Sequence, residues 1–263
     1  MATHSAVINV MLTVVRKASR PLLRDFGEIE NLQTSRKGPG DFVTKADLRT
    51  DRILVEELTK ARPRFGVISE EGGERAGEAG EPVWVIDPID GTANLTHGLP
   101  HFAISVALVQ DGTPMAGVIY DPIADDMYWA ERGIGAYLND RRIRVSARRQ
   151  LDDCLIATGF PNVGEGGHER HLAELGAIGP AVAGIRAIGS AALALAYVAA
   201  GRFDAYWDRN LQAWDTAAGA LLVREAGGTV SDLAGRAQSV PEAELLAGGL
   251  DVHDLLRRQL RNL

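Results

Sequence analysis

One apolar segment that ends in an acidic turn constrains this chain more than any other feature. Residues 84–98 have the sequence WVIDPIDGTANLTHG. The apolar residues Val83–Ile86 predict a strand buried in a sheet, and Pro88 is expected to turn the chain out of it. Gly91 lets the backbone approach a bound group closely, and the residues after it can begin a helix. The segment therefore predicts a strand, a tight turn and a helix start, in that order.

The polar side chains of this turn indicate a particular chemistry. Asp87 and Asp90 offer the carboxylate oxygens that hard divalent cations prefer, and Thr92 adds a hydroxyl. Free N–H groups at the start of a helix attract phosphate. Asp-Pro and Asp-Gly also occur in ordinary turns, so the segment alone leaves both interpretations open.

Two further acidic groups favour a metal and phosphate site. Glu70 and Glu71 follow a β-like run at 65–68, and Asp215 lies at the expected start of a helix, directly after Trp214. Acidic residues at the ends of strands and helices can meet at one rim of an α/β fold. The presence of these additional acidic residues therefore favours a shared cation site over a set of ordinary turns.

These motifs, in their order and spacing, resemble the inositol monophosphatase family of Mg²⁺-dependent, lithium-sensitive phosphatases. The resemblance covers nearly the whole chain and rests on Glu70-Glu71, on residues 84–97 and on residues 214–228. Residues 40–47 are also similar to the mobile hairpin of the family and the start of its second helix. The resemblance implies an α/β (α+β) fold, a layered αβαβα sandwich of the inositol monophosphatase and fructose-1,6-bisphosphatase type.

The sequence pattern predicts two halves. Residues 1–150 are expected to form an α+β half with a mainly antiparallel sheet and most metal ligands, and residues 151–263 an α/β half that holds the substrate side and Asp215. The expected helices lie near 5–29, 46–62 (capped by Asp47), 167–177, 190–200 and 215–226. The expected strands lie at 65–68, 83–86, 102–110, 114–120, 127–130, 136–138, 143–145, 155–158, 184–187 and 205–207.

Composition excludes some classes of function. The formal charge of −7 argues against general nucleic-acid binding, which neutralises phosphates with Lys and Arg. Bound metal ions would invert the local charge of an acidic site and so admit a phosphate ester. Cys154 is the single cysteine, so no internal disulfide is expected and the predicted location is the reducing cytoplasm. No apolar run has the length of a membrane span, so no membrane partner is expected.

The resemblance also implies the residues of the site. Two or three Mg²⁺ ions would be held by Glu70, Asp87, the carbonyl of Ile89, Asp90 and Asp215. The catalytic residues would be Glu70 and Thr92, which orient and deprotonate a water, and Asp47, which polarises Thr92. The substrate-binding residues would be Asp90, Gly91, Thr92, Ser190, Ala191 and Asp208. Either Arg36 or Lys37 would replace the lysine of the family's mobile loop.

The implied activity is a phosphoric monoester hydrolase that acts on a small polyol or sugar phosphate. The preferred substrate is inositol 1-phosphate, hydrolysed to inositol and phosphate by in-line attack of a Mg²⁺-activated water. Histidinol phosphate, fructose 1,6-bisphosphate and 3′(2′),5′-bisphosphate nucleotides are hydrolysed by relatives and stay open. The animal inositol enzymes carry a longer carboxylate at the position of Asp208. Members of the family are commonly homodimers, so a homodimer is expected.

An arginine cluster leaves a non-enzymatic alternative. The cluster consists of Arg141, Arg142, Arg144, Arg148 and Arg149. Charged residues on the edge of a hairpin deter strand pairing, which is their simplest role. Some bacterial relatives bind transcription complexes, so a regulatory protein that binds RNA polymerase or RNA is the alternative. Every oxygen ligand that the phosphatase chemistry requires is present, which favours the enzyme.

Overall fold

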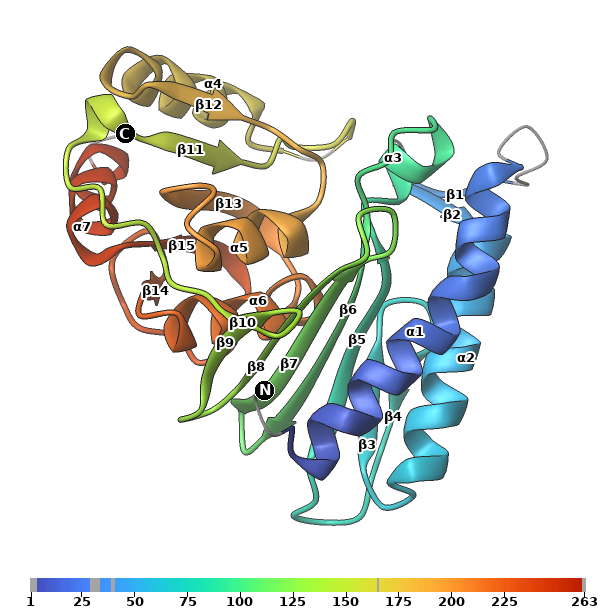
Figure 1. Ribbon diagram of the computed structural model, residues 1–263. Helices are drawn as coiled ribbons and strands as arrows, with labels where there is room; N and C mark the ends of the chain where they lie inside the picture. The colour runs from blue at the N-terminus through green and yellow to red at the C-terminus, as the bar shows by residue number, and fades with distance from the viewer. Residues whose placement is uncertain (1–3, 29–33, 39–40, 165, 262–263) are drawn as a thin grey trace.

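The structure, a computed structural model, describes residues 4–28, 34–38, 41–164 and 166–261, with the backbone alone described at 34–38 and 41–43. Its helices and strands are stacked in the layer order α, β, α, β, α (Figure 1). The predicted α/β fold, a layered αβαβα sandwich, is confirmed. No helix of these residues is long and apolar enough to cross a membrane.

The larger sheet holds eight strands of the described chain, in the order β10-β9-β8-β7-β6-β5-β3-β4. They are β3 (Gly66–Ser69), β4 (Gly73–Arg75), β5 (Val83–Asp90), β6 (Ala103–Gln110), β7 (Thr113–Asp121), β8 (Asp126–Glu131), β9 (Gly135–Leu138) and β10 (Arg141–Arg142). Neighbouring strands are antiparallel except β3 and β5, which run parallel. The turn after β6 has positive φ angles at Asp111 (+50°) and Gly112 (+69°), as a tight two-residue hairpin requires. The predicted hairpin is therefore confirmed.

Two long helices, α1 (Ala6–Gly27) and α2 (Lys45–Ala61), cover one face of this sheet, and a small hairpin of β1 (Thr34–Gly38) and β2 (Asp41–Thr44) connects them. Ser5 caps α1, because its hydroxyl accepts the N–H of Ile8 at 3.2 Å. The apolar residues of both helices recur every three or four positions and pack on Trp84 and its neighbours in the sheet. Both helices were expected from this periodicity.

The middle layer consists of α5 (Ala191–Ala199) and α6 (Ala213–Glu225), which lie between the two sheets. Both helices are rich in alanine and buried on nearly all sides, so the sheets approach them closely. The second sheet has the order β12-β11-β13-β15-β14. Its strands are β11 (Leu155–Thr158), β12 (Gly184–Arg186), β13 (Ala205–Leu211), β14 (Thr229–Ser231) and β15 (Ala243–Gly248).

The last layer covers the outer face of the second sheet. It contains α4 (His168–Ile178) and α7 (Leu250–Leu260), with the short 3₁₀ turns η2 (Leu151–Asp153) and η3 (Gly179–Ala181) beside them. The sequence pattern did not predict β14, β15 or α7. The predicted helices of this half, near 167–177, 190–200 and 215–226, correspond to α4, α5 and α6.

The proposed division at residue 150 falls between the two sheets. The chain leaves the larger sheet after β10 and enters the second sheet at β11. One apolar core nevertheless joins the halves, because α5 and α6 pack on Ile119 of the larger sheet and on Leu245 of the second. The two halves as separate domains stay a prediction.

The expected end of the β5 strand is wrong. β5 continues through Pro88 to Asp90, and Pro88 does not turn the chain out of the sheet. The pairing with β6 passes from Asp87 opposite Ser105 to Asp90 opposite Ala103, so β5 has one extra residue there. Such a bulge tolerates proline, because the lost N–H falls at a break in the ladder.

Two other expectations need correction. Thr44, not Asp47, is the N-cap of α2: its hydroxyl accepts the N–H groups of Ala46 and Asp47, while the Asp47 carboxylate accepts the N–H of Thr44 at 2.8 Å. The predicted strand at 143–145 does not form. The N–H of Ile143 still donates to the carbonyl of Ala136 in β9 at 2.9 Å, but the N–H of Val145 donates to the carbonyl of Ala226 at the end of α6.

The close contact of α5 and α6 gives a test of this packing. A Cβ added at Gly219 of α6 would lie 2.5 Å from Cβ of Leu195 on α5, so the two helices would have to separate. We expect Gly219→Ala to lower the free energy of unfolding by about 1–3 kcal/mol, as overpacking of a core does. Urea denaturation measures this change.

The matched control is Gly176→Ala on α4, where an added Cβ would meet nothing within 4 Å. This variant should be neutral or gain up to about 1 kcal/mol, because alanine is the better helix former. Equal effects of the two substitutions would contradict the proposed packing.

Candidate active site

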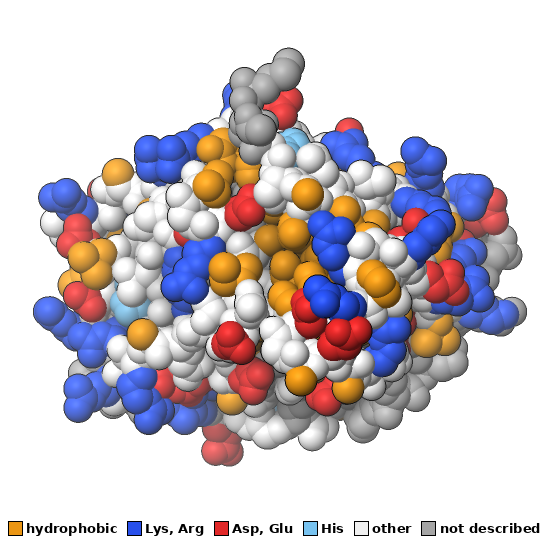
Figure 2. All heavy atoms as spheres, turned by 90° about the horizontal axis from the view of Figure 1, so that it is seen from below, with side chains coloured by type: hydrophobic (Ala, Val, Ile, Leu, Met, Phe, Trp, Pro, Cys, Tyr) orange, Lys and Arg blue, Asp and Glu red, His pale blue; other side chains and the backbone are white. Residues whose placement is uncertain are grey.

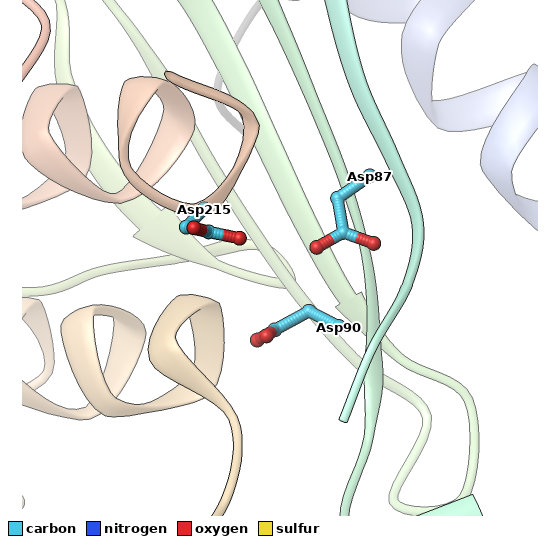
Figure 3. A group of neighbouring side chains, drawn as sticks. All are labelled: Asp87, Asp90 and Asp215. Atoms are coloured by element: carbon cyan, nitrogen blue, oxygen red, sulfur yellow. The ribbon is translucent and has the colours of Figure 1, made fainter. Parts of the chain in front are cut away.

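Three aspartates from distant parts of the chain meet at one point. Asp87 and Asp90 lie at the end of β5, and Asp215 lies in the first turn of α6. One oxygen of each carboxylate lies within 4.8 Å of one oxygen of the other two, and the three side chains point toward a common centre (Figure 3). The structure thus brings together three of the residues that the sequence analysis expected to bind metal.

Each carboxylate is held by neighbouring polar groups. Asp87 accepts the N–H of Ile89 at 3.0 Å, and Asp215 accepts the N–H of Gln212 at 2.7 Å, which also caps α6. Asp90 is held by the N-terminus of α5: it accepts a short hydrogen bond from the hydroxyl of Ser190 and the N–H of Ala192 at 2.7 Å. These bonds orient the three side chains.

The carboxylates repel one another in a buried place. Burial raises the pKa of Asp87 well above its ordinary value, and the negative charges of Glu70, Asp90 and Asp215 raise it further. Burial and then the charge of Asp90 raise the pKa of Asp215 well above the ordinary value. Burial also raises the pKa of Asp90, although the bonds from Ser190 and Ala192 oppose this shift. A cation between these groups would remove the repulsion.

A cavity of about 190 Å³ opens in front of these carboxylates. Its lining residues are Glu70, Asp87, Ile89, Asp90, Gly91, Thr92, Ala93, Asn162, Gly189 and Asp215. Glu70 enters because β3 runs parallel to β5 and ends beside it, where the N–H of Glu70 donates to the carbonyl of Ile86 at 3.2 Å. The cavity therefore contains every residue that the sequence analysis expected to ligate metal.

Thr92 connects this cavity to α2. Its hydroxyl lies 2.9 Å from a carboxylate oxygen of Asp47 and 3.0 Å from the carbonyl oxygen of Ile89. Burial raises the pKa of Asp47, against the opposing effect of the hydrogen bonds from Thr44 and Thr92. A raised pKa makes a carboxylate a better proton acceptor, so Asp47 and Thr92 form a proton-accepting pair at the cavity wall.

A glycine is required at position 91 because two other segments of the chain approach its backbone closely. Its φ angle is +101°, and an added Cβ would lie 3.2 Å from the carbonyl oxygens of both Gly189 and His101. A side chain there would be strained and crowded. Gly91 thus lets α3 (Thr92–Thr96) begin directly at the cavity, with its first N–H groups free of helical partners.

A second cavity, of about 170 Å³, adjoins the first. Both are lined by Asn162 and Gly189, and the second is also lined by Ser190, Ala191 and Asp208. Asp208 accepts a hydrogen bond of 2.5 Å from the hydroxyl of Tyr206. The three residues expected to bind substrate from the second half therefore lie together, next to the metal ligands.

Some details differ from what the sequence suggested. The N–H of Ala191 and the hydroxyl of Ser190 both bond to Asp90, so these groups hold Asp90 in place. Asn162, which lines both cavities, was not predicted; the only signal for it is its position in the loop that follows the parallel strand β11. The side chains of Arg36 and Lys37, expected in the mobile loop, lie outside the described part of the chain.

The donor set fits a divalent cation. Carboxylate and carbonyl oxygens are hard ligands, and three carboxylates that converge without a cationic side chain among the cavity residues carry an excess of negative charge. Glu70, Asp87, the carbonyl of Ile89, Asp90 and Asp215 are the residues that would hold such a cation. The geometry therefore supports metal-dependent chemistry at this site.

Comparison with known proteins gives a consistent result. A model of the inositol monophosphatase family matches residues 3–263. Inositol-1-monophosphatase of Rhizobium meliloti is 51% identical over 98% of this chain and 97% of its own length. Nus factor SuhB of Pseudomonas aeruginosa is 41% identical over 92% of this chain and 91% of its own. The crystal structure of the extragenic suppressor protein suhB from Bartonella henselae superposes with a TM-score of 0.94, at 51% identity over 98% of this chain and 99% of its own.

The repulsion among the carboxylates gives a prediction about stability. Because burial and like charges raise their pKa values, the folded state binds more protons than the unfolded state, so the cation-free protein should lose stability as the pH rises above 4. At pH 7 in EDTA, we expect Asp87→Asn to raise Tm by about 2 °C or more, since it removes one charge without changing the volume. Scanning calorimetry measures both effects.

Added Mg²⁺ should raise the Tm of the unmodified protein, because a ligand that binds the folded state stabilises it. Asp87→Asn should lose this increase. Asp121→Asn is a matched control: Asp121 is also a buried aspartate with a raised pKa, but it accepts the N–H of Ile123 and does not line the cavity. If Asp87→Asn retained the full Mg²⁺ response, the proposed metal site would be wrong.

Proposed function

This chain belongs to the inositol monophosphatase family, and we propose that it hydrolyses inositol 1-phosphate to inositol and phosphate with the help of divalent cations. The observation that carries this proposal is the convergence of Asp87, Asp90 and Asp215 within 4.8 Å of one another, beside Glu70 and Thr92. A phosphate ester is anionic, so such an acidic cavity can accept it only after cations have inverted its charge.

The proposed metal is Mg²⁺, with two or three ions. Glu70, Asp87 and the carbonyl of Ile89 would hold one, and Asp87, Asp90 and Asp215 would hold another. When bound, such ions acidify the attacking water and stabilise the charge that develops on the leaving oxygen. Mg²⁺ keeps several waters in its shell, so a few shared carboxylates suffice.

The chain itself supplies the base. Glu70 would orient the attacking water, and the Thr92 hydroxyl would accept a hydrogen bond from that water. Asp47, 2.9 Å away from this hydroxyl, would receive the proton that Thr92 gives up. The raised pKa of Asp47 supports this role, because it favours the protonated carboxyl at the end of the transfer.

The phosphate would rest on the N–H groups of Gly91 and Thr92. These groups lie at the start of α3, where the helix leaves its first donors without partners. Phosphate oxygens are good acceptors for such N–H groups, and the glycine leaves the backbone exposed to them. The phosphorus would then face the carboxylate centre, in line with an attack from the side of Thr92.

The alcohol part of the substrate would occupy the adjoining cavity of about 170 Å³. Asp208 would accept hydrogen bonds from its hydroxyls, with Asp90 and the backbone of Ser190 and Ala191 beside it. Tyr206 holds Asp208 in position, and Gly159 leaves room for it, because a Cβ there would overlap the carboxylate. A hydroxyl-rich ring matches this wall of oxygen acceptors better than a purely apolar alcohol would.

Other phosphate esters remain candidates. Histidinol phosphate, fructose 1,6-bisphosphate and 3′(2′),5′-bisphosphate nucleotides share the phosphate group, so the metal site alone does not discriminate among them. The inositol ester is favoured because relatives named for that activity, including the enzyme of Rhizobium meliloti, match nearly the full chain.

A regulatory role is the second candidate function. It is favoured by relatives such as the Nus factor SuhB of Pseudomonas aeruginosa, and it would involve the arginine cluster and RNA polymerase or RNA. Two arginines of the cluster are neutralised, since Arg148 pairs with Asp204 at 3.1 Å and Arg149 with Asp251 at 3.2 Å. Arg141 and Arg142 are exposed on the edge strand β10. The complete acidic cavity favours the enzyme as the primary function.

A homodimer is proposed as the working form. The exposed apolar side chains of Phe160, Val163 and Leu172, which are 54%, 71% and 58% exposed, support an interface near β11 and α4. The cytoplasmic location expected from the single cysteine and the sensitivity to lithium stay predictions.

The substrate is tested by phosphate release. The purified protein is assayed with Mg²⁺ against inositol 1-phosphate, histidinol phosphate, fructose 1,6-bisphosphate and 3′-phosphoadenosine 5′-phosphate. We expect the highest kcat/KM for the inositol ester, inhibition by lithium, and loss of activity in EDTA. Asp87→Asn protein, prepared in the same way, controls for contaminating phosphatases and should be slower by several orders of magnitude. Equal rates for the two proteins would refute the proposal.

The role of the hydroxyl is tested at Thr92. Thr92→Ala should lower kcat by about 10²–10⁴-fold and leave KM within a small factor, because the group acts on the attacking water and not on the bound ester. Thr92→Ser retains the hydroxyl and should stay within about tenfold of the unmodified kcat. If the alanine variant changed KM alone, Thr92 would be a binding residue.

A further inference from the structure

A larger cavity lies at the opposite end of α6 from Asp215. Its volume is about 250 Å³, and it is lined by Thr113, Pro114, Arg132, Leu221, Arg224, Glu225, Ala237, Gln238 and Ser239. Arg224 follows Asp215 by nine residues, which places it about 14 Å further along the helix axis. Figure 2 views the molecule from the end that carries the β6–β7 turn, opposite α3, where basic, acidic and hydrophobic side chains are intermixed. This cavity is therefore separate from the carboxylate centre.

Two arginines face this cavity without a carboxylate partner. The guanidinium of Arg224 is half-buried and donates to the carbonyls of Ser239, at 2.7 Å, and of Gln238. Arg132, on the turn between β8 and β9, is exposed. In the part of the chain that the structure describes, neither guanidinium forms an ion pair with Asp or Glu. Carbonyl oxygens fix Arg224 but do not neutralise its charge.

Glu225 also lines the cavity, but both oxygens of its carboxylate already accept hydrogen bonds. Its carboxylate accepts the N–H of Gly133 at 2.8 Å and the N–H of Gly135 at 2.9 Å. These bonds join α6 to the turn that begins with Arg132, and so hold the two arginines on one rim. Glu225 therefore holds the turn that carries Arg132 and, among the described residues, forms no ion pair with either arginine.

The positive charges of Arg132 and Arg224 repel each other at this cavity. Burial lowers the pKa of Arg224, and the charge of Arg132 lowers it further. An anion that accepts charge-assisted hydrogen bonds from both guanidinium groups at one cavity would offset this repulsion. A planar guanidinium binds a tetrahedral oxyanion with two N–H groups at once.

We propose that this cavity is a binding site for the phosphate or sulfate group of a small molecule. Arg132 and Arg224 would bind the oxyanion, and Thr113, Gln238 and Ser239 offer further polar atoms. Leu221 and Pro114 form an apolar wall for the remainder of the molecule. Since a water molecule takes about 30 Å³, the cavity has room for an oxyanion with an attached organic group. The site does not depend on the function proposed for the carboxylate centre.

The test uses inorganic sulfate and phosphate as separate probes of the intact protein in EDTA, which removes the cations that the carboxylate centre needs to bind anions. Titration is followed in ¹H–¹⁵N spectra. We expect saturable shifts at the amides of Gly133 and Gly135 and no comparable shift at Gly91. Arg132→Glu should weaken the affinity by about tenfold or more, since it removes a charge-assisted bond and adds a repulsion.

The matched control is Arg141→Glu, which changes the net charge equally on β10 and should leave the affinity within about twofold. Arg132 and Arg141 are both exposed, so both variants should fold; their spectra confirm this directly. Asp87→Asn should also bind the anions unchanged. The proposal is wrong if the unmodified protein shows no saturable shift, if the two arginine variants weaken binding equally, or if Asp87→Asn abolishes it.

Discussion

The structure depends on three aspartate carboxylates that are buried close to one another. Asp87, Asp90 and Asp215 carry carboxylates whose pKa values are raised by burial and by one another, a state that only hydrogen bonds or cations can stabilise. The fold supplies the hydrogen bonds: the N-terminus of α5 holds Asp90, and the first turn of α6 holds Asp215. The remaining repulsion is what a divalent cation between these carboxylates would remove.

Three neighbouring layers of the sandwich contribute residues to the acidic cavity and its wall. The larger sheet brings Glu70 and Asp87 to the ends of two parallel strands, and α2 places Asp47 within hydrogen-bond distance of Thr92. The middle helices bring their N-termini to the same rim. Because the alanine-rich helices pack closely between two sheets, small shifts in this core would move the carboxylates of Asp90 and Asp215 relative to each other.

The two ends of α6 lie at two different cavities, one with the carboxylates and one with the two arginines. Its N-terminal turn carries Asp215 in the acidic cavity, and its C-terminal turn carries Arg224 in the basic one. Cations suit the first cavity, where the carboxylates repel one another, and an oxyanion suits the second, where Arg132 and Arg224 form no ion pair with the one carboxylate that lines the cavity, Glu225. The acidic cavity is the site that we propose for phosphate ester hydrolysis, whereas the second cavity adds a ligand site that this reaction does not require.

The sequence by itself determined the local structure and the chemistry of the site. Periodicity predicted α1, α2 and the hairpin after β6, and the segment from Trp84 to His97 predicted the acidic turn, because these depend on neighbouring residues. Only the tertiary structure decided which side chains meet. Four features depend on the packing of segments far apart in the chain, which no local pattern encodes: the bulge at Pro88, the bond from Ser190 to Asp90, the place of Asn162 and the shared cavity of Arg132 and Arg224.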